Sequence, residues 1–263
     1  MTGGGRGVGR LVAETLARHG RPVAVTSRTR QDLDVTVAAV RASGGRATAY
    51  PADARSTAAV SAVVAAAENE LGPVEILVSS AGSAAAIGPA WEVDADAWWL
   101  DVETNLRSAF NYARAVLPGM IARGEGRIVN VSSYAGTRPG PYMSAYAAAK
   151  AALVNFSESL AAETAGTGVK VFAMTPGLFE SALTEGLMSE SARRWLPDVG
   201  TGRWVEPAQV AALVEFVASG NGDALAGRFL HALDDLEELA ANAGDIVERD
   251  LLTLRLRRWD VDQ

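Results

Sequence analysis

The sequence predicts an α/β fold in three layers, with a doubly wound parallel sheet covered by helices on both faces. Short β-branched runs alternate with longer alanine-rich stretches of helical periodicity, and the strand-like runs are apolar almost throughout. This alternation predicts helical crossovers between parallel strands, and continuous apolar strands indicate a sheet that is buried on both faces. Because no linker or internal repeat interrupts the pattern, we expect residues 1–263 to form one domain.

The expected elements follow one another in strand–helix order. Helices end where glycine allows the left-handed conformation, at Gly20, Gly72, Gly124 and Gly166. The expected strands are 23–26, 47–50, 76–79, 127–131 and 170–174, and the expected helices are 8–19, 31–42, 57–71, 95–122, 145–164 and 208–218.

The C-terminal part, residues 234–263, differs from the rest. It is acidic and then basic, with apolar residues at helical spacing between Asp234 and Arg255, and it closes on a basic run that includes Arg258 and Trp259. We expect a helical extension that packs on the domain, with a subunit contact or a lid as the alternative.

Composition excludes several classes of function. The net charge of −7 disfavours a nucleic-acid partner, since phosphates require a basic face. The absence of cysteine excludes disulfides and thiolate chemistry and is compatible with a cytoplasmic location. No apolar run is long enough to span a membrane, and the start does not resemble a signal peptide. The two histidines, His19 and His231, lie in no metal-ligand pattern.

The N-terminus is rich in glycine and opens the first expected helix. Glycine lets a backbone approach a diphosphate closely, and a helix N-terminus supplies free N–H donors and a positive dipole end. A flexible tail is the alternative, but the helix and strand that follow at once favour a phosphate site. The expected cofactor contacts here are Gly3, Gly5, Arg6, Gly7, Val8 and Gly9.

A strand normally precedes such a glycine motif, and here only Met1 stands before Thr2. We hypothesise that the natural start lies upstream and that the first strand is truncated. Otherwise the sheet has a vacancy beside the strands at Val23 and Ile76, with unpaired backbone groups. Mass spectrometry of protein from the native locus would test this, and an N-terminus at Met1 would contradict it.

The second strand of such a fold usually ends on an acid that binds the adenosine ribose of NAD. This chain has Ser27 and Arg28 there instead. Arg28 and Arg6 would suit a 2′-phosphate, because guanidinium groups pair well with that anion. The sequence therefore favours NADP(H) over NAD(H), with ordinary surface arginines as the alternative.

Tyr146 and Lys150 give the strongest chemical signal. Their i, i+4 spacing places both on one helix face. A nearby ammonium lowers the pKa of a phenol from its usual value of about 10 toward the working range. Ser133 follows an expected strand, at the sheet edge where ligands bind, and its hydroxyl is suited to a substrate carbonyl oxygen. The neighbouring Ser132 should point to the other side of the strand and have a structural role.

These motifs occur together in an order that resembles the short-chain dehydrogenase/reductase family, whose fold is of the Rossmann type. The resemblance spans about residues 2–230 and rests on Thr2–Gly9, Asn105, Ser133, Tyr146-x-x-x-Lys150 and Pro176-Gly177. It implies that Tyr146 exchanges a proton with the substrate oxygen, which Ser133 orients. It also implies that Lys150 binds the nicotinamide ribose and tunes Tyr146, while Asn105 holds a water of the proton relay.

The same resemblance implies further cofactor contacts. Asp53 would contact the adenine, although a neighbour of a helix N-cap is nearly as good an interpretation. The remaining contacts implied are Ala54, Ala81, Gly82, Tyr146, Lys150, Pro176 and Gly177. The sequence departs from the family at Ser79-Ser80, where Asn-Asn is usual, and in its longer, more charged C-terminus.

These patterns predict an NADP-preferring oxidoreductase that acts on a carbonyl/alcohol pair. A catalytically silent nucleotide-binding or scaffold protein is the alternative, since fold does not fix function, and dehydration or epimerisation on the same fold is a third possibility. The segment 178–199 suits a small apolar or aromatic substrate, unless its side chains simply pack a lid helix. The apolar residues of this segment are Phe179, Leu187, Met188, Trp195 and Leu196, with Trp91 and Tyr142 nearby.

The resemblance also suggests a homo-oligomer, a dimer or tetramer through helices 95–122 and 145–164.

Overall fold

The computed structural model describes residues 1–257, so residues 258–263, including Arg258 and Trp259 of the expected extension, lie outside the described residues. Every strand pairing is parallel, β1 with β2 and then β3 through β6 in order, which confirms the predicted fold class. The strands are β1 (Val23–Ser27), β2 (Ala47–Pro51), β3 (Ile76–Ser79), β4 (Gly126–Val131), β5 (Val169–Thr175) and β6 (Phe229–His231).

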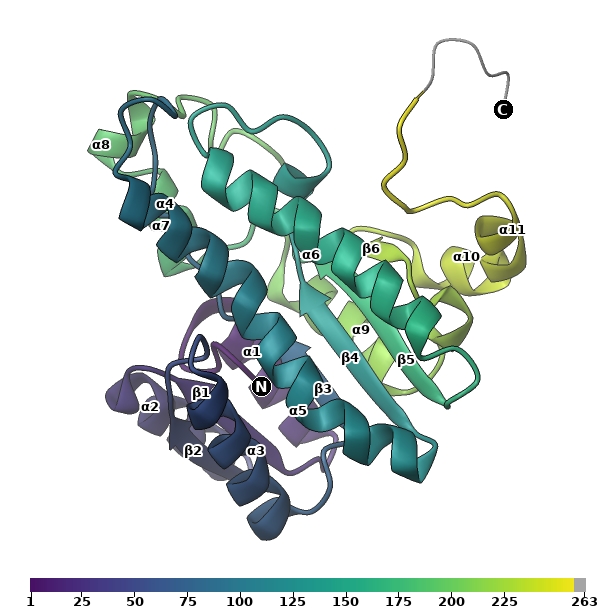
Figure 1. Cartoon of the computed structure of the whole chain (residues 1–263). Helices are drawn as coiled ribbons and strands as arrows, with labels where there is room; N and C mark the ends of the chain where they lie inside the picture. The colour runs from purple at the N-terminus through teal and green to yellow at the C-terminus, as the bar shows by residue number, and fades with distance from the viewer. Residues whose placement is uncertain (258–263) are drawn as a thin grey trace.

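Helices cover both faces of the sheet (Figure 1). On one face lie α1 (Gly7–Arg18), α2 (Arg30–Ala42) and α9 (Pro207–Ala218). On the other face lie α3 (Thr57–Leu71), α5 (Ser108–Arg123) and α6 (Ser144–Glu163). Each predicted helix except the long one at 95–122 appears within two residues of its expected ends.

The strands supply side chains to both layers of the core. In β4, Ile128 packs with the α3 and α5 side and Val129 with the α1 and α9 side; in β5, Val171 and Phe172 divide in the same way. Alternate residues of a strand point to opposite faces, so each strand must be apolar at nearly every position. The continuous apolar runs in the sequence arise from this arrangement.

The sheet is interrupted between β1 and β3. Among residues 1–257, Thr2 alone bridges the two parts, opposite Thr26 and Ser79, and its N–H donates to the carbonyl of Val78 at 3.0 Å. Beside this bridge lies a hollow of about 240 Å³, lined mainly by apolar side chains of α1, α3, β3 and α5. The vacancy expected beside Val23 and Ile76 is therefore present, while the hypothesis about the natural start stays a prediction.

The helix predicted over 95–122 is not regular. It consists of α4 (Ala95–Val102), a π-helical turn η1 (Glu103–Arg107) and α5. A π turn inserts one extra residue into a helix, and such turns are frequent at functional sites. This turn carries Asn105, one of the predicted catalytic residues.

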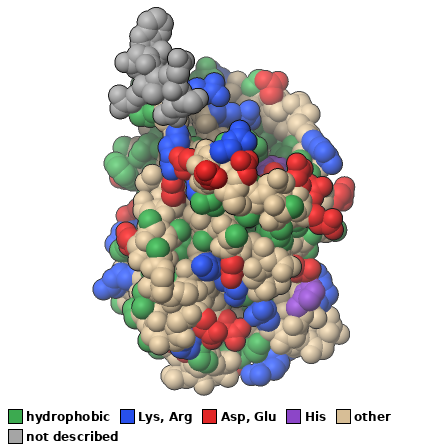
Figure 2. Space-filling model, turned by 90° about the vertical axis from the view of Figure 1, so that its right-hand side faces the viewer, with side chains coloured by type: hydrophobic (Ala, Val, Ile, Leu, Met, Phe, Trp, Pro, Cys, Tyr) green, Lys and Arg blue, Asp and Glu red, His purple; other side chains and the backbone are tan. Residues whose placement is uncertain are grey.

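The C-terminal extension is also less regular than predicted. Two short helices, α10 (Leu236–Ala241) and α11 (Ala243–Glu248), replace the single expected one, and Ile246 of α11 packs into the core. Arg255 then pairs with Asp250 and with Glu158 of α6. Figure 2 shows this side of the molecule, where basic and acidic side chains are intermixed. Within residues 1–257, no helix combines the length and apolar character needed to cross a membrane.

Candidate active site

A groove of about 420 Å³ runs along the carboxyl ends of the strands. At one end it is bordered by the glycine-rich loop and by the residues that follow β1 and β2, which we call the adenosine end. At the other end it is bordered by Ser133, Tyr146 and Lys150, which we call the catalytic end. Parallel sheets bind ligands at this edge.

The glycine-rich loop is folded so tightly that side chains would not fit. A Cβ on Gly3 would lie 2.9 Å from the backbone of Ser80, and a Cβ on Gly9 would lie 2.2 Å from the carbonyl oxygen of Gly3. The helix α1 begins at Gly7, and its N-cap, Arg6, makes no capping hydrogen bond with its side chain. The free N–H groups of the first turn border the groove, so this loop fits a diphosphate.

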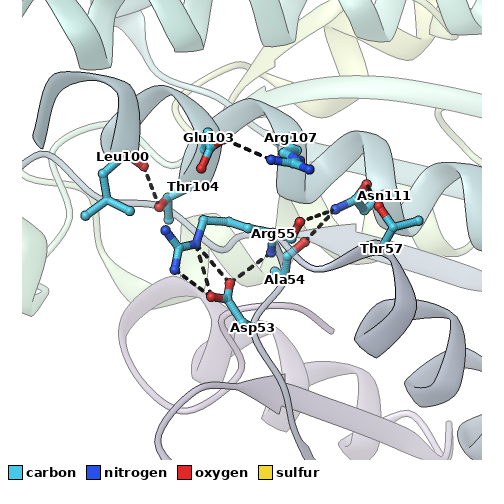
Figure 3. Close-up of polar contacts among 9 residues, drawn as sticks. All are labelled: Asp53, Ala54, Arg55, Thr57, Leu100, Glu103, Thr104, Arg107 and Asn111. Carbon is cyan, nitrogen blue, oxygen red and sulfur yellow. Dashed lines mark hydrogen bonds and ion pairs between the residues drawn. The ribbon is translucent and has the colours of Figure 1, made fainter. Parts of the chain in front are cut away.

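The adenosine end is rich in charge. Arg6 and Arg28 are exposed and line the groove, together with Ser27. Asp53 and Arg55 also line the groove and form an ion pair, with the Arg55 Nη2 2.6 Å from Asp53 Oδ2 (Figure 3). Hydrogen bonds from Arg55 hold the pKa of Asp53 below its usual value.

The turn that carries this pair is tied to α5. Asn111 donates from Nδ2 to the carbonyls of Ala54 at 3.0 Å and Arg55 at 3.1 Å, and its Oδ1 accepts from the Thr57 hydroxyl at 3.1 Å (Figure 3). Neither Arg55 nor Asn111 was predicted from the sequence. An arginine two residues after a site aspartate was the available signal for Arg55, whereas nothing local pointed to Asn111.

At the catalytic end, two serines directly follow β4, and their side chains point to opposite sides of the chain. Ser132 is buried and donates to the carbonyl of Lys150 at 2.8 Å, so its predicted structural role is confirmed. Ser133 lines the groove, and its Oγ accepts from the N–H of Ala135 at 3.2 Å. The Ser133 hydroxyl therefore faces the groove beside the Tyr146 phenol, with which it forms a hydrogen bond.

The helix α6 brings Tyr146 and Lys150 to the same wall. The ammonium nitrogen lies 5.5 Å from the centre of the phenol ring and donates to the carbonyl of Val131 at 2.7 Å. Gly136 allows the approach of α6, since a Cβ there would lie 2.6 Å from the backbone nitrogen of Ala151. Close backbone packing therefore fixes the position of both side chains relative to Ser133.

Burial dominates the titration of both groups. It lowers the pKa of Lys150 to about 7, because the charged ammonium is disfavoured away from water. It raises the pKa of the Tyr146 phenol, and a hydrogen bond with Ser133 opposes that rise. The lowering of the Tyr146 pKa by Lys150, expected from the spacing, is therefore not the leading effect in this structure.

Asn105 is buried within the π turn, with 1% of its surface exposed. Its Nδ2 donates to the carbonyls of Ser83 at 2.7 Å and Asp101 at 2.8 Å. Among the described residues, no group donates to its buried Oδ1, which would lie 2.8 Å from a Cβ on Gly82. A buried acceptor without a donor is costly, so this atom fits a water or ligand donor from the adjoining groove.

Asp101 is a buried carboxylate that was not predicted from the sequence. Its oxygens accept from the hydroxyl of Ser83 at 2.6 Å and from the N–H groups of Ala85 at 2.7 Å and Ala86 at 2.8 Å. It thus holds the loop that forms the groove wall beside Gly82, while its backbone carbonyl holds Asn105. The available signal was an acid at the end of an otherwise apolar helical run.

The segment after β5 closes the groove. Pro176, Gly177 and Ser181 line it, and Ser181 caps α7 (Ala182–Leu187) against the glycine-rich loop near Gly7. Of the apolar residues predicted for a substrate pocket, Phe179 lines the groove. Leu187 and Leu196 are buried and Tyr142 lies against Trp195, so for these residues the lid-packing alternative describes the structure better. Trp91 is exposed and fits neither interpretation.

Ser79, which stands where the family usually has asparagine, leaves buried polar atoms without hydrogen bonds. Ser79 of β3 faces Asn130 of β4, and both the Ser79 hydroxyl and the Asn130 Oδ1 are buried without a hydrogen-bond partner in the described part of the chain. The departure from the family at Ser79 therefore leaves these two polar atoms without the hydrogen bonds that buried groups usually make. Among residues 1–257 no cluster of three or more acidic or histidine side chains suits a metal ion.

A glycine loop at a helix N-terminus and a buried Tyr–Lys pair at the same sheet edge define an oxidoreductase that uses a nicotinamide dinucleotide. The family described as short chain dehydrogenase matches residues 1–192. The chain therefore belongs to the short-chain dehydrogenase/reductase family and is an NAD(P)-dependent oxidoreductase.

Relatives and solved structures agree with this assignment. A short chain dehydrogenase of Pseudocercospora fijiensis is 38% identical over 97% of this chain and 87% of its own length. A 3-oxoacyl-acyl-carrier-protein reductase of Vibrio cholerae is 34% identical over 88% of this chain and 93% of its own. The crystal structure of an actinorhodin polyketide ketoreductase variant with NADPH has a TM-score of 0.82 at 32% identity, covering 88% of this chain and 93% of that one. An NAD⁺-bound xylitol dehydrogenase has a TM-score of 0.79 at 27% identity, covering 88% and 95%.

Proposed function

We propose that this oxidoreductase prefers NADP(H) and interconverts a carbonyl and an alcohol. The observation that carries the proposal is the buried pair of Tyr146 and Lys150 beside Ser133, which shares one groove with the glycine-rich loop. A catalytically silent protein would gain nothing from burying an ammonium and a phenol side by side, because each costs free energy to desolvate.

The chemistry divides between the cofactor and the protein. The nicotinamide, when bound, supplies or accepts the hydride. Ser133 donates its hydroxyl hydrogen to the substrate oxygen and orients it. Tyr146 delivers a proton to that oxygen in reduction and removes it in oxidation, while Lys150 favours the phenolate and Asn105 holds a water behind them.

Two arginines support the NADP preference. Arg6 and Arg28 border the adenosine end from the glycine loop and from the end of β1, where an acid would repel a 2′-phosphate. The relatives include both types, since one solved neighbour is named with NADPH and another as NAD⁺-bound. The preference therefore rests on these two side chains. We also propose the remaining cofactor contacts: Gly3, Gly5, Gly7, Val8, Gly9, Ser27, Asp53, Ala54, Ala81, Gly82, Pro176 and Gly177.

For the substrate we propose a small apolar or aromatic carbonyl compound. The groove beside Ser133 is bordered by Phe179 and Leu183 and by the small side chains of Ala84 and Ala85. These side chains offer apolar contact and no charge, which suits such a substrate.

We further propose a cytoplasmic homo-oligomer, a dimer or a tetramer. Large apolar side chains are exposed along α4, α5 and their surroundings, including Trp99 at 61% and Phe110 at 48%. Apolar side chains gathered on a helix face favour contact with another subunit. Light scattering of the wild type and of Phe110→Asp tests this: we expect an assembly that the charge weakens, and a monomeric wild type would refute it. Fractionation of cells that express the tagged protein tests the location.

The central experiment is a titration of the purified protein with NADPH and with NADH, followed by nicotinamide fluorescence. We expect tighter binding of NADPH, weakened about 10- to 100-fold by Arg28→Ala, which is the scale of one charge-assisted hydrogen bond. Equal binding of both cofactors would refute the NADP preference. Binding without turnover in a broad screen of carbonyl compounds would favour the silent-scaffold alternative.

A further inference from the structure

His231 lies half-buried at the end of β6, behind the wall of the catalytic end. It stands opposite Thr175 in the pairing of β6 with β5, and Thr175 is followed by Pro176 and Gly177 of the groove wall. His231 is not itself among the groove-lining residues. Any effect of this histidine on a bound cofactor must therefore pass through the residues that it contacts.

The imidazole contacts two segments that frame the catalytic end. A Cβ on Gly177 would lie 3.1 Å from Cε1 and 3.2 Å from Nε2 of His231, so the ring fills the space where a side chain at that position would lie. The ring of Tyr134 packs edge-on against the imidazole, with the centroids 5.0 Å apart. Tyr134 directly follows Ser133 and begins the 3₁₀ turn η2 (Tyr134–Gly136). One ring thus contacts both the turn at Gly177 and the segment after Ser133.

A hydrogen bond holds the imidazole in this orientation. Its Nδ1 accepts from the N–H of Leu233 at 2.8 Å, and the Asp234 carboxylate closes the same turn by accepting from the backbone N–H of His231 at 2.7 Å. A neutral imidazole whose Nδ1 accepts carries its hydrogen on Nε2, whereas a protonated imidazole has two donors and no acceptor. The bond from Leu233 therefore exists only while His231 is neutral.

The surroundings favour the neutral ring. Burial lowers the pKa of His231 from its ordinary value of 6.5, and the negative charge of Asp234 opposes that shift. Within residues 1–257, Asp234 is the one charged group that acts on the ring, since Tyr134 of η2 and Gly177 carry no charge at neutral pH. The ring is therefore neutral at physiological pH and gains a proton only in mild acid.

We propose that neutral His231 is a positioning residue for the bound dinucleotide, because it holds the turn at Gly177 against the segment that follows Ser133. The inference rests on the proposed cofactor contact of Gly177. A ring that gains a proton loses the hydrogen bond from Leu233 and turns toward the carboxylate of Asp234. The space beside Gly177 then empties, and this residue moves easily because glycine has no Cβ to restrict its backbone. Cofactor affinity therefore falls as the ring is protonated.

Binding of the oxidised dinucleotides tests this without a substrate. NADP⁺ and NAD⁺ are titrated by calorimetry between about pH 5 and 8, the range in which histidine changes charge, into wild type and His231→Asn. An asparagine oxygen accepts from the N–H two residues on, as Nδ1 of His231 does, but does not titrate. The ratio of the two dissociation constants cancels the titration of groups that both proteins share, such as Lys150.

We expect the ratio to depend on pH. At the alkaline limit the two proteins should bind equally, and at the acid limit the wild type should bind about three- to tenfold more weakly than His231→Asn, which is the scale of one hydrogen bond. A histidine that only fills space would give a ratio that stays constant across the range. A constant ratio would therefore overturn the proposal.

His231→Phe separates the hydrogen bond from the packing. A phenyl ring keeps the contacts with Gly177 and Tyr134 but has no acceptor for the N–H of Leu233. This variant should bind about three- to tenfold more weakly than wild type at the alkaline limit, with no further loss relative to His231→Asn in acid. Wild-type affinity in a folded His231→Phe variant, as judged by circular dichroism, would refute the role of the hydrogen bond. If this variant does not fold, the ratio of wild type to His231→Asn decides alone.

The other histidine of the chain serves as the control. His19 follows α1, is exposed, and has its Nδ1 3.4 Å from the Glu215 carboxylate, away from the groove-lining residues. His19→Asn should keep the pH dependence of the wild type. If the wild type bound neither dinucleotide at any pH, the proposed cofactor site would fail and this inference with it. If it bound one tightly with a constant ratio, only the inference would fail.

Discussion

The two ends of the groove are built in different ways. At the catalytic end, Tyr146 is 9% exposed, Lys150 4% and Asn105 1%, and each is fixed by backbone packing or by hydrogen bonds to backbone carbonyls. At the adenosine end, Arg6 and Arg28 are exposed. A buried polar group that leaves its hydrogen-bond partners loses much free energy, so it keeps one geometry. Exposed charges are screened by solvent and salt, and their side chains can change position. Chemistry therefore depends on the rigid end and cofactor choice on the adjustable end.

The largest expected effect separates chemistry from binding. Tyr146→Phe removes the proton-transfer group at the buried end, so turnover should fall about 10²- to 10⁴-fold. NADPH affinity should stay within about twofold, since the glycine loop and the adenosine end are untouched. Steady-state kinetics together with fluorescence titration measure both quantities. Unchanged turnover would remove Tyr146 from the mechanism.

The buried ammonium predicts a pH-dependent stability. The pKa of Lys150 is about 7 in the folded protein, against an ordinary lysine value of 10.5 in the unfolded chain, so between these values the unfolded chain binds more protons and folding stability rises with pH. Below about pH 7 both states are protonated and the full penalty applies. Urea unfolding of wild type and Lys150→Met should show a difference that changes by up to about 1.4 kcal/mol per pH unit in this window. Parallel profiles would mean that Lys150 is better solvated than the structure indicates.

Asp101 tests whether the loop at the catalytic end must be held. Asp101→Ala leaves three donors without an acceptor, of which the N–H of Ala86 is buried, so the free energy of unfolding should fall by about 1–3 kcal/mol. We expect kcat/KM to fall about tenfold with it, because the groove wall and Asn105 lose their support. Asp101→Asn keeps an acceptor for the two backbone N–H groups and should restore most of both quantities. Asp96→Ala, on the exposed side of the same helix, is the control, and equal losses from alanine and asparagine would contradict the positioning role.

The smallest expected effect belongs to the adenosine end. Raising the salt concentration from about 0.05 to 0.5 M shortens the screening length severalfold and should weaken NADPH binding about fivefold. Turnover at saturating cofactor should change by less than about twofold, since the catalytic groups are buried. A strong salt effect on turnover would show that the two ends are not as distinct as their exposure suggests.

Most of the fold was predictable because it follows from local periodicity. The apolar strands and the spacing of Tyr146 and Lys150 are repeated, short-range signals, and the structure places Ser133, Tyr146 and Lys150 on one groove. Such signals survive folding because both sides of each strand must be buried.

The features that escaped prediction depend on contacts distant in the sequence. The Asn111 contacts with the Ala54–Arg55 turn join residues 57 and 56 positions apart, and the burial of Asp101 depends on the path of a loop. The π turn was missed because one extra residue barely disturbs a helical pattern. The pKa of Tyr146 was predicted from one neighbour, although burial outweighs that neighbour.

The π turn has a consequence for insertions and deletions. Deleting one residue within Glu103–Arg107 would convert η1 to a regular helix. Because the wider π turn absorbs the extra residue, the rotation of α4 relative to α5 would change little. Asp101 before the turn, and Tyr112 and Met120 after it, would therefore keep their contacts. The turn itself would narrow, and Asn105 would leave the position from which its Nδ2 reaches the carbonyl of Ser83. A one-residue deletion would thus leave both helices in place and change only the polar group that η1 presents beside the groove.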